Sequence, residues 1–577
     1  MPAEANGIQV NFCKNPACSN YGVAPKATVV RGSAAHGLPQ DTYVVQTGGV
    51  GLLVLNCRAC GEFPPIKSNV AIHEERSRFL ADLIGRPEPC CPDATCSNHS
   101  APVSRGHDAY QSFGLTKSGS RRYRCKACRK TFSVGKSTTG HKRPHKNRTV
   151  FSLLMNKSPL RRICEVADID PKTLYGKIDF LHDQCLALAA DREKRLLAGM
   201  ALPRLYLATD RQDYAVNWAR QQDRRNVVLH AVGTADNVTG YVFGLHLNYD
   251  PALDAVAVER AALAAGDAQA KVPFRRYARC WLDADYQAAL KARSGGKPAG
   301  SADLPSAIAA TYAAAAQRAD VEVAETAGAG RRLPTRGVQI HAEYTLYGHF
   351  FFLRELFGGV ERLRFFLDQD SGMRAACLAA FQPEIKARTA DAFYVRIAKE
   401  LTVSQKRAAL AASRARFVAA QQAHPSLTDG ALQVLLIKAA LAQMATLGKW
   451  RDRWLTDPFP SMSEPEKAVC YLTDCSDYDP DHLARLYHKA SLHGIDRFFM
   501  QVRRRLSVLE RPISTASKAG ATWYGYSAYN PQTIVKLLGS FRVFYNYCLA
   551  GKDGKTPAMR LGLAKGTVSL EDIIYFA

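Results

Sequence analysis

From residue 203 onward, five short apolar runs have the length and residue types of β-strands. Three of them follow one another closely, are separated by turn residues and predict an antiparallel meander. Two more come after a long interval, with a helical stretch at 373–386 between them. The runs are RLYLATD (204–210), NVVLHAVG (226–233), GYVFGLHL (240–247), RLRFFLD (362–368) and AFYVRIAKEL (392–401).

This succession of three strands, a helix, a strand, a helix and a strand is the order of an RNase H-like sheet. We therefore expect a multidomain α+β protein in which residues 200–577 form an RNase H-like α/β/α domain. Two stretches interrupt it. Residues 250–335 are rich in alanine with Gly/Pro/Ser breaks and predict a surface helix and a flexible loop. Residues 403–490 have long apolar-periodic runs and predict a helical insertion.

Residues 149–195 have helical periodicity in two stretches that meet near residue 170, where Pro171 suits a helix start. Two helices joined by such a turn form the helix-turn-helix, which places its second helix in the major groove of DNA. Apolar faces are expected at Leu160, Ile163 and Val166 and at Leu174, Ile178 and Leu181. Positions expected to face DNA are Lys172, Thr173, Tyr175 and Lys177.

Composition adds a class of partner to this picture. The chain has 577 residues, and its 77 Lys and Arg exceed its 52 Asp and Glu, so it should attract a polyanion such as double-stranded DNA. The first residues lack a basic segment followed by an apolar one, and no run is long enough to span a bilayer. We therefore expect a cytoplasmic protein with no membrane partner, in which clustered cysteines bind metal.

Eight of the 16 cysteines form two similar sets. In each set the first two cysteines have four residues between them, the last two have two, and the letters CSN close the first pair. Each set can complete a tetrahedral, structural Zn2+ site. We predict two zinc ribbons, at 1–75 and 76–148, and two Zn2+ ions. Cys90 is an alternative to Cys91, which the repeat favours. The ligands are Cys13, Cys18, Cys57 and Cys60, then Cys91, Cys96, Cys125 and Cys128.

The second ribbon is the better candidate for a DNA contact. Between Arg105 and Arg148 there are 13 Lys or Arg and one acid, Asp108. Such an imbalance is expected of a surface that lies against phosphates. The predicted contacts are Arg121, Arg122, Arg124 and Lys126.

Two acids follow the apolar runs that should be neighbouring strands. Asp210 ends the first run and Asp368 the fourth, so the two side chains should meet. Asp213 and Asp370 are close rivals, but we expect them further into the turns. Carboxylates clustered in this way suit two Mg2+ or Mn2+ ions, which clamp the attacking and leaving oxygens in phosphoryl transfer.

The segment FGLTKSGSRRYRCKACRKTFS (113–133), followed by the helical pair, resembles the N-terminus of insertion-sequence transposases of the DDE type. That family has a third acid on a later helix, followed by Arg at the next, seventh and ninth positions. Asp496, near the start of an expected helix, fits this pattern, although the family usually has Glu there. Glu510, which we expect near the end of the same helix, is the alternative. The arginines expected beside the active site are Arg497, Arg503, Arg504 and Arg505.

The resemblance implies a bacterial transposase associated with the nucleoid. It would bind the terminal inverted repeats of its element, cleave them and join them to target DNA as a dimer or larger assembly. Two alternatives remain: a non-enzymatic DNA-binding regulator derived from a transposase, and an RNase H-like recombination nuclease. Neither zinc content nor DNA binding separates these readings, whereas metal-dependent strand cleavage does.

Overall fold

The computed structural model describes residues 1–25, 42–47, 52–85, 88–103, 108–117, 120–135, 137–138, 140–217, 222–291, 303–316, 327, 330–398, 401–448, 451–510 and 526–576. The chain forms two compact units. Unit 1 comprises Met1–Phe79, Leu196–Gln501 and Arg511–Ile534, and unit 2 comprises Leu80–Arg195, Val502–Glu510 and Val535–Ala577. A multidomain protein of mixed helices and strands is therefore confirmed.

An eight-stranded mixed sheet is the core of unit 1, in the order β13-β14-β15-β12-β11-β6-β7-β8. Strands β6, β7 and β8 form the predicted antiparallel meander, and β11 and β12 run parallel to β6. The five predicted strands are β6 (Leu205–Val216), β7 (Val227–Asp236), β8 (Val242–Leu247), β11 (Leu363–Asp368) and β12 (Ala390–Ile397).

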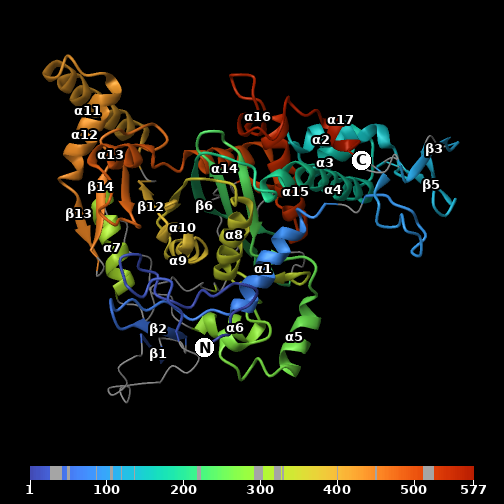
Figure 1. Ribbon diagram of the computed structural model, residues 1–577, viewed down its shortest axis with the longest axis horizontal. Helices are drawn as coiled ribbons and strands as arrows, with labels where there is room; N and C mark the ends of the chain where they lie inside the picture. The colour runs from blue at the N-terminus through green and yellow to red at the C-terminus, as the bar shows by residue number, and fades with distance from the viewer. Residues whose placement is uncertain are drawn as a thin grey trace. The chain divides into compact units, whose positions relative to one another are not determined.

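Helices cover both faces of this sheet. On one face, Phe350 of α8 (Ala342–Leu356) packs on Phe365 of β11, with ring centroids 6.0 Å apart. The helices α9 (Ser371–Ala380) and α10 (Gln382–Lys386) lie on the same side, and Figure 1 shows all three in front of β6. On the other face, Phe393 of β12 contacts Tyr487 of α13 (Pro480–Lys489). Unit 1 is therefore layered as helix, sheet and helix.

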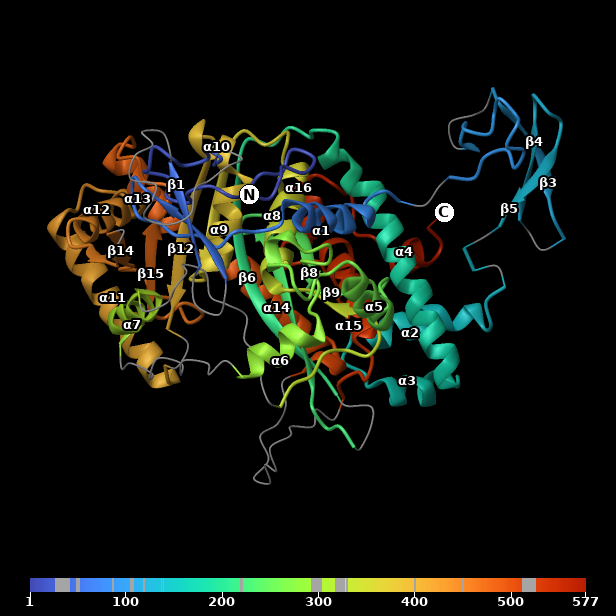
Figure 2. The ribbon, with the colours of Figure 1, turned by 90° about the horizontal axis from the view of Figure 1, so that it is seen from below.

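The insertion at 403–490 is not purely helical, which corrects the expectation from periodicity. It contains α11 (Val403–Ala423), α12 (Asp429–Leu441) and α13, but also three strands that extend the sheet beyond β12 (Figure 2). These strands are β13 (Ala445–Leu447), β14 (Asp452–Thr456) and β15 (Lys467–Tyr471). These strands are too short to show a clear alternation of apolar and polar residues in the sequence. In addition, β15 lies inside the sheet and is buried at every position, so it has no polar face.

The alanine-rich insertion contains short helices, as predicted. They are α5 (Ala255–Ala264), η5 (Val272–Phe274), α6 (Asp283–Lys291) and α7 (Leu304–Ala316). The Gly/Pro/Ser break SGGKPAGSADLPS (294–306) that indicates the flexible loop falls largely outside the described residues, and its last residues begin α7. Two short strands, β9 (Tyr249–Asp250) and β10 (Val338–Gln339), pair at the two ends of this insertion.

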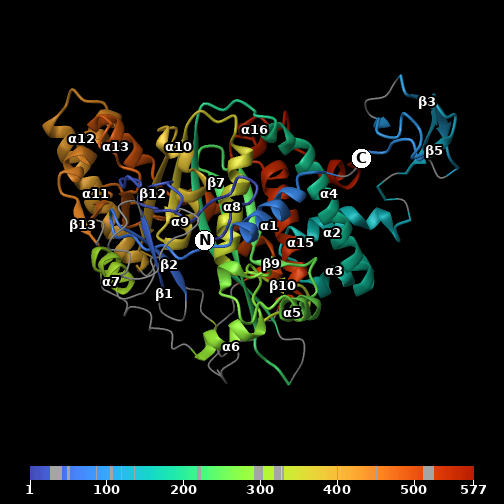
Figure 3. The same ribbon diagram turned by 60° about the horizontal axis from the view of Figure 1, so that its bottom comes forward.

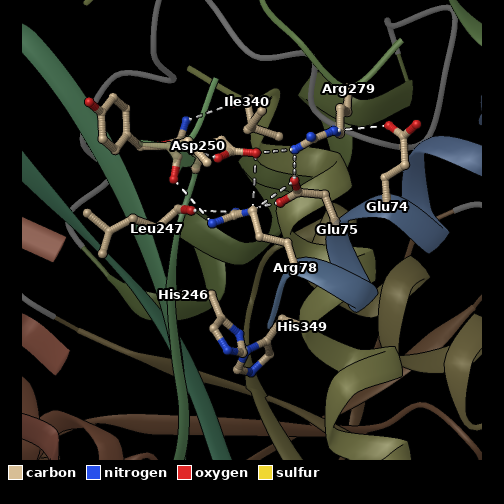
Figure 4. A network of polar contacts seen from close by, with 12 residues as sticks. Glu74, Glu75, Arg78, His246, Leu247, Asp250, Arg279, Ile340 and His349 are labelled. Carbon is tan, nitrogen blue, oxygen red and sulfur yellow. Dashed lines mark hydrogen bonds and ion pairs between the residues drawn. The ribbon is translucent and has the colours of Figure 1, made fainter. Parts of the chain in front are cut away.

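The helix α1 (Asn69–Ala81) joins unit 1 through a buried ionic network (Figure 4). Glu75, which is fully buried, pairs with Arg78 at 2.7 Å and with Arg279 at 2.6 Å. Arg279 also pairs with Asp250 at 3.0 Å. These contacts hold α1 against the segment that follows β8.

Unit 2 contains the predicted helical pair within a three-helix group (Figure 3). The helices are α2 (Asn147–Leu154), preceded by η4 (Pro144–Lys146), α3 (Leu160–Ala167) and α4 (Pro171–Leu197). The break near 170 is confirmed, and α4 runs for 27 residues. Val166 is 63% exposed, so the expected apolar face is wrong at that position, and Ala167 is buried beside Ile163 instead. The C-terminal elements are α15 (Pro531–Val543), η7 (Phe544–Cys548), α16 (Pro557–Leu561) and α17 (Leu570–Ile574).

Candidate functional site

Asp210 and Asp368 occupy matching positions on neighbouring strands. The strands β6 and β11 are parallel, and the last printed pair in their register is Thr209 with Leu367. Asp210 and Asp368 are the next residues on each strand. Parallel strands lie about 4.8 Å apart and matched residues point to the same face. The register therefore places the two residues side by side on one face of the sheet, as the sequence pattern predicts.

The register also separates this pair from its rivals. Asp213 lies in β6 rather than in a turn, and three residues from Asp210 its side chain points to the opposite face. There it contacts His230 at 2.6 Å. Asp370 does lie beyond its strand, where its carboxylate caps α9 by accepting the N–H of Met373. Asp213 therefore lies on the other face of the sheet, whereas Asp370 stays close to the pair, because its carboxylate also forms an ion pair of 3.3 Å with Arg211, the residue after Asp210.

The helix α14 (His493–Arg505) lies on the same face of the sheet as the two acids. Asp210 pairs with Gly233 of the adjacent strand β7. If residue 233 carried a Cβ atom, that atom would lie only 2.8 Å from the side chain of Ile495 in α14. Phe499, one turn further on, would be 3.2 Å from the same Cβ. Glycine at this position therefore lets α14 approach the strand next to Asp210.

The two candidates for the third acid differ in position. Asp496 lies in the first turn of α14, next to Ile495, and is half-buried. The helix ends at Arg505, so Glu510 is not on it, which corrects the expectation of one helix bearing both acids. Glu510 is exposed and pairs with Lys157 at 2.8 Å. Within the described residues, only the two cysteine sets bring three or more metal-ligating atoms within 4.8 Å of one another.

Both predicted cysteine sets come together. In the first ribbon, Sγ of Cys13 lies 3.4 Å from that of Cys60, and Sγ of Cys18 lies 3.7 Å from that of Cys57. The second ribbon has the same two distances, for Cys91 with Cys128 and for Cys96 with Cys125. Each set could bind a structural Zn2+ ion, because four thiolates fill its tetrahedral coordination. Cys91, and not Cys90, completes the second set.

The repeat extends to residues that support the cysteines. The amide of Asn20 donates to Sγ of Cys57 at 3.3 Å, and that of Asn98 donates to Sγ of Cys125 at 3.4 Å. These asparagines end the two CSN sequences, which was the available signal, but sequence reasoning did not assign them a role. Tyr43 and Tyr110 also correspond, since each hydroxyl accepts the N–H of the first cysteine.

The first ribbon is built into unit 1. Its hairpin of β1 (Tyr43–Thr47) and β2 (Leu53–Cys57) precedes Glu62, which is fully buried and pairs with Arg374 of α9 at 3.0 Å. The Tyr21 hydroxyl donates to the carbonyl of Leu378, also in α9, at 2.7 Å. Burial raises the pKa of Tyr21, so this hydroxyl keeps its proton. The first ribbon thus braces the helix that follows Asp368.

The second ribbon has an open, basic sheet. It consists of β3 (Tyr110–Leu115), β4 (Arg121–Cys125) and β5 (Thr131–Val134), in that order. Tyr110, Tyr123 and Phe132 form its small core with the cysteines. Arg121 and Lys126 are exposed, and Arg122 and Arg124 are half-buried. All four predicted contacts are thus accessible in this module.

One predicted DNA contact of the helical pair is wrong. Lys177 is only 4% exposed, and its ammonium donates to the carbonyls of Lys142 and Arg143 at 3.0 Å and to Oδ1 of Asn147 at 2.5 Å. Burial lowers the pKa of Lys177. Its position on a helix suggested a surface cation, but the preceding loop folds over it.

The other predicted positions remain accessible on α4. Lys172 and Tyr175 are exposed, while Thr173 is half-buried. The Thr173 hydroxyl donates to Asp170 at 2.6 Å, and Asp170 also accepts the N–H of Thr173. Asp170 therefore caps the start of α4, and Thr173 contributes to that cap.

The arginines of α14 differ in environment. Arg497 and Arg504 are exposed, and Arg503 is half-buried. Arg505 donates to Oδ1 of Asn156 at 3.1 Å and lies over the ring of Phe544, so it has a structural role within unit 2.

Comparison with protein families and with curated proteins finds no match for this chain. Among the helices that the structure describes, none combines the length and apolar character needed to cross a bilayer.

Proposed function

We propose that the chain is a DNA transposase, in which Asp210 and Asp368 hold divalent ions for DNA strand cleavage and strand transfer. The observation that carries the proposal is the matched position of these two acids on β6 and β11. Neighbouring carboxylates on one face of a sheet offer the oxygen ligands that Mg2+ and Mn2+ prefer. Asp210 is only 8% exposed, which suits a ligand rather than a solvated surface acid.

The strand order β8-β7-β6-β11-β12, with helices on both faces, supports an RNase H-like fold for this part of unit 1. Asp496 is the proposed third ligand, since α14 packs beside Asp210 on the same face. Two ions bound there would stabilise charge on the attacking and leaving oxygens. Water would first hydrolyse a phosphodiester and leave a 3′ hydroxyl and a 5′ phosphate. The 3′ hydroxyl would then attack a phosphodiester of the target DNA and displace the 3′ oxygen of the target strand, which leaves as a hydroxyl.

DNA recognition is proposed for α3 and α4 and for the second ribbon. A turn of three residues, 168–170, joins α3 to α4, and Lys172 and Tyr175 are exposed near the start of α4. The start of the second helix is the part that contacts base edges in helix-turn-helix proteins. Arg497 is an exposed cation on α14, one residue beyond Asp496, and would neutralise a phosphate near the acids.

Strand cleavage tests the proposal. The purified zinc-loaded chain should cleave, in the presence of Mg2+, DNA carrying the inverted repeats that flank its gene. Asp210→Asn and Asp368→Asn should abolish cleavage but retain DNA binding. Asp213→Asn is the matched control, because it makes the same change in β6 on the opposite face of the sheet. Cleavage that persists in both Asp210→Asn and Asp368→Asn would refute the proposed site.

A DNA-binding regulator without catalysis is the second candidate. It is favoured by one observation: among the described residues, no three acidic side chains each bring an oxygen within 4.8 Å of the others. Mg2+-independent binding to the same DNA, with no cleavage product from the unmodified chain, would support this candidate over the transposase.

A further inference from the structure

Among the residues that the structure describes, no apolar core covers one face of the sheet in the second ribbon. The opposite face carries Tyr110, Tyr123 and Phe132, which pack with the cysteines. On the open face, Gln111 of β3 pairs with Arg124 of β4, and Arg124 pairs with Thr131 of β5. The three strands are labelled in Figure 2. This face is polar at these positions, and it also carries one aromatic ring.

That ring belongs to Phe113, which is 42% exposed. The guanidinium of Arg122 lies 5.2 Å from its centroid and that of Arg124 lies 5.9 Å from it. Arg122 and Arg124 are two residues apart on β4, so they share one face of the sheet. An exposed phenylalanine in a water-facing sheet is thus flanked by two cations.

The charge around this ring favours an anionic ligand. No ion pair is found for Arg121, Arg122 or Arg124 among the described residues, whereas Lys130 nearby pairs with Asp93 at 2.8 Å. The Nε of Arg124 is buried and has no hydrogen-bond partner. The hydroxyls of Thr131 and Ser133 are exposed beside these arginines and could donate to phosphate oxygens.

We propose that this face binds single-stranded DNA, with one unpaired base stacked on Phe113 and the flanking phosphates on Arg122 and Arg124. Aromatic rings in a positively charged groove bind single strands because every base has a π-face, whereas a duplex hides that face between base pairs. The ring on β3 lies within 6 Å of both guanidinium groups on the adjacent strand β4, so a base stacked on it would have cations beside it. The inference deepens the proposed function, since cleavage at DNA ends exposes unpaired strands.

The test compares single-stranded and duplex DNA of one sequence. The full-length zinc-loaded chain is titrated into each fluorescent oligonucleotide over a range of salt concentrations, with no divalent cation added. Phe113→Ala should weaken binding of the single strand about 5- to 100-fold. The duplex affinity should stay within about twofold, because a duplex offers no unpaired base to stack on residue 113, and the cations of the ribbon and of α4 are unaltered. Phe113→Tyr should bind like the unmodified chain.

The salt dependence separates stacking from charge. Phe113→Ala should leave the slope of log affinity against log salt unchanged, whereas Arg122→Gln should reduce it by about 0.7 for a single strand. The matched control is Leu115→Ala, which removes a 66% exposed side chain from the same strand. Equal losses for Phe113→Ala and Leu115→Ala, or an equal loss for single strand and duplex, would overturn the inference.

Two controls keep the outcomes distinct. The zinc content of each variant shows that the ribbon is folded. Binding is measured without cleavage, so an inactive Asp210→Asn chain gives the same answer. Failure of the cleavage assay with a retained Phe113 effect therefore counts against the transposase alone.

Discussion

Glu62 of the first ribbon and Arg374 of α9 form an ion pair of 3.0 Å, although 312 residues separate them in the chain. The helix α9 begins directly after Asp370, two residues beyond Asp368. The cysteine turn that precedes Glu62 is thus connected to the end of β11 by one pair of charges. Both ribbons carry a set of four cysteines, but the first one also contacts the helix that follows the sheet strand bearing Asp368.

Arg374→Ala should destabilise unit 1 by about 3–5 kcal/mol, because it leaves the buried carboxylate of Glu62 without its partner. All five tryptophans fall within the ranges of unit 1, so urea denaturation followed by tryptophan fluorescence reports on this unit. The control is Lys438→Ala, which breaks the exposed pair with Asp481 and should cost less than about 1 kcal/mol. Equal effects of the two substitutions would show that the buried pair stabilises unit 1 no more than an exposed pair does.

Asn98→Ala should weaken zinc binding in the second ribbon about 10- to 100-fold, because hydrogen bonds to a ligand orient it and tune its basicity. Asn20→Ala should do the same in the first ribbon. Competition with a zinc chelator measures both affinities. Ser97→Ala is the control, since Ser97 is exposed and adjacent to Asn98. If Asn98→Ala and Ser97→Ala have the same zinc affinity, the hydrogen bond from the asparagine does not strengthen zinc binding.

Hydrophobic patterning predicted the five central strands and the neighbouring positions of Asp210 and Asp368. The prediction succeeded because the first part of β6 and most of β11 are buried on both faces and each buried run leads to an acid, although β6 continues to Val216 beyond Asp210. Cysteine spacing likewise predicted both ligand sets. These signals are local, and each depends on a few consecutive residues.

Features that depend on distant residues were missed. Lys177 looks like a surface cation, but carbonyls about 35 residues earlier accept its protons. The run LQVLLIKAALAQMATL predicts helix throughout, yet its last residues form β13 by pairing with β14. The distinct roles of the two ribbons follow from Glu62 and Arg374, a contact that spacing does not encode.

Lys177→Met should destabilise the three-helix group rather than weaken DNA binding directly. The substitution leaves the carbonyls of Lys142 and Arg143 buried without a donor, at a cost of about 1–3 kcal/mol. Hydrogen exchange of peptides from α2 and α4 should accelerate. Lys172→Met is the control on the same helix and should leave hydrogen exchange unchanged. It should reduce the slope of log duplex affinity against log salt concentration by about 0.9, because one phosphate contact is lost. Unchanged exchange in Lys177→Met would contradict the structural role.

His349 should make unit 1 less stable in acid. Burial lowers its pKa to about 3, so the folded chain keeps it neutral while the unfolded chain protonates it below about pH 6.5. The unfolded state then binds more protons, and stability falls by about 1.4 kcal/mol per pH unit as pH decreases from 6.5. The neighbours of His349 are the hydroxyl of Thr234 at 2.7 Å and the ring of His246 at 2.8 Å.

Between pH 6.5 and pH 5, the free energy of unfolding of His349→Gln should therefore fall by about 2 kcal/mol less than that of the unmodified chain. Urea denaturation followed by tryptophan fluorescence measures this difference. The exposed His424→Gln is the control and should leave the slope unchanged. The comparison uses the slope rather than the absolute stability, because removing the ring also changes packing. Parallel pH profiles for His349→Gln and the unmodified chain would contradict this assignment.

Replacing each candidate for the third acid, Asp496 or Glu510, by its amide identifies which one binds metal. Asp496 lies on α14, whose Ile495 packs against Gly233 opposite Asp210, whereas Glu510 pairs with Lys157 beyond the end of the helix. Asp496→Asn should therefore reduce Mg2+-dependent DNA cleavage by more than about 100-fold, because it removes a charged metal ligand. Glu510→Gln breaks only an exposed ion pair, so it should change stability by less than about 1 kcal/mol and retain cleavage. Loss of cleavage in Glu510→Gln with normal cleavage in Asp496→Asn would reverse the assignment, and it would require residue 510 to approach the acids on β6 and β11 when DNA binds.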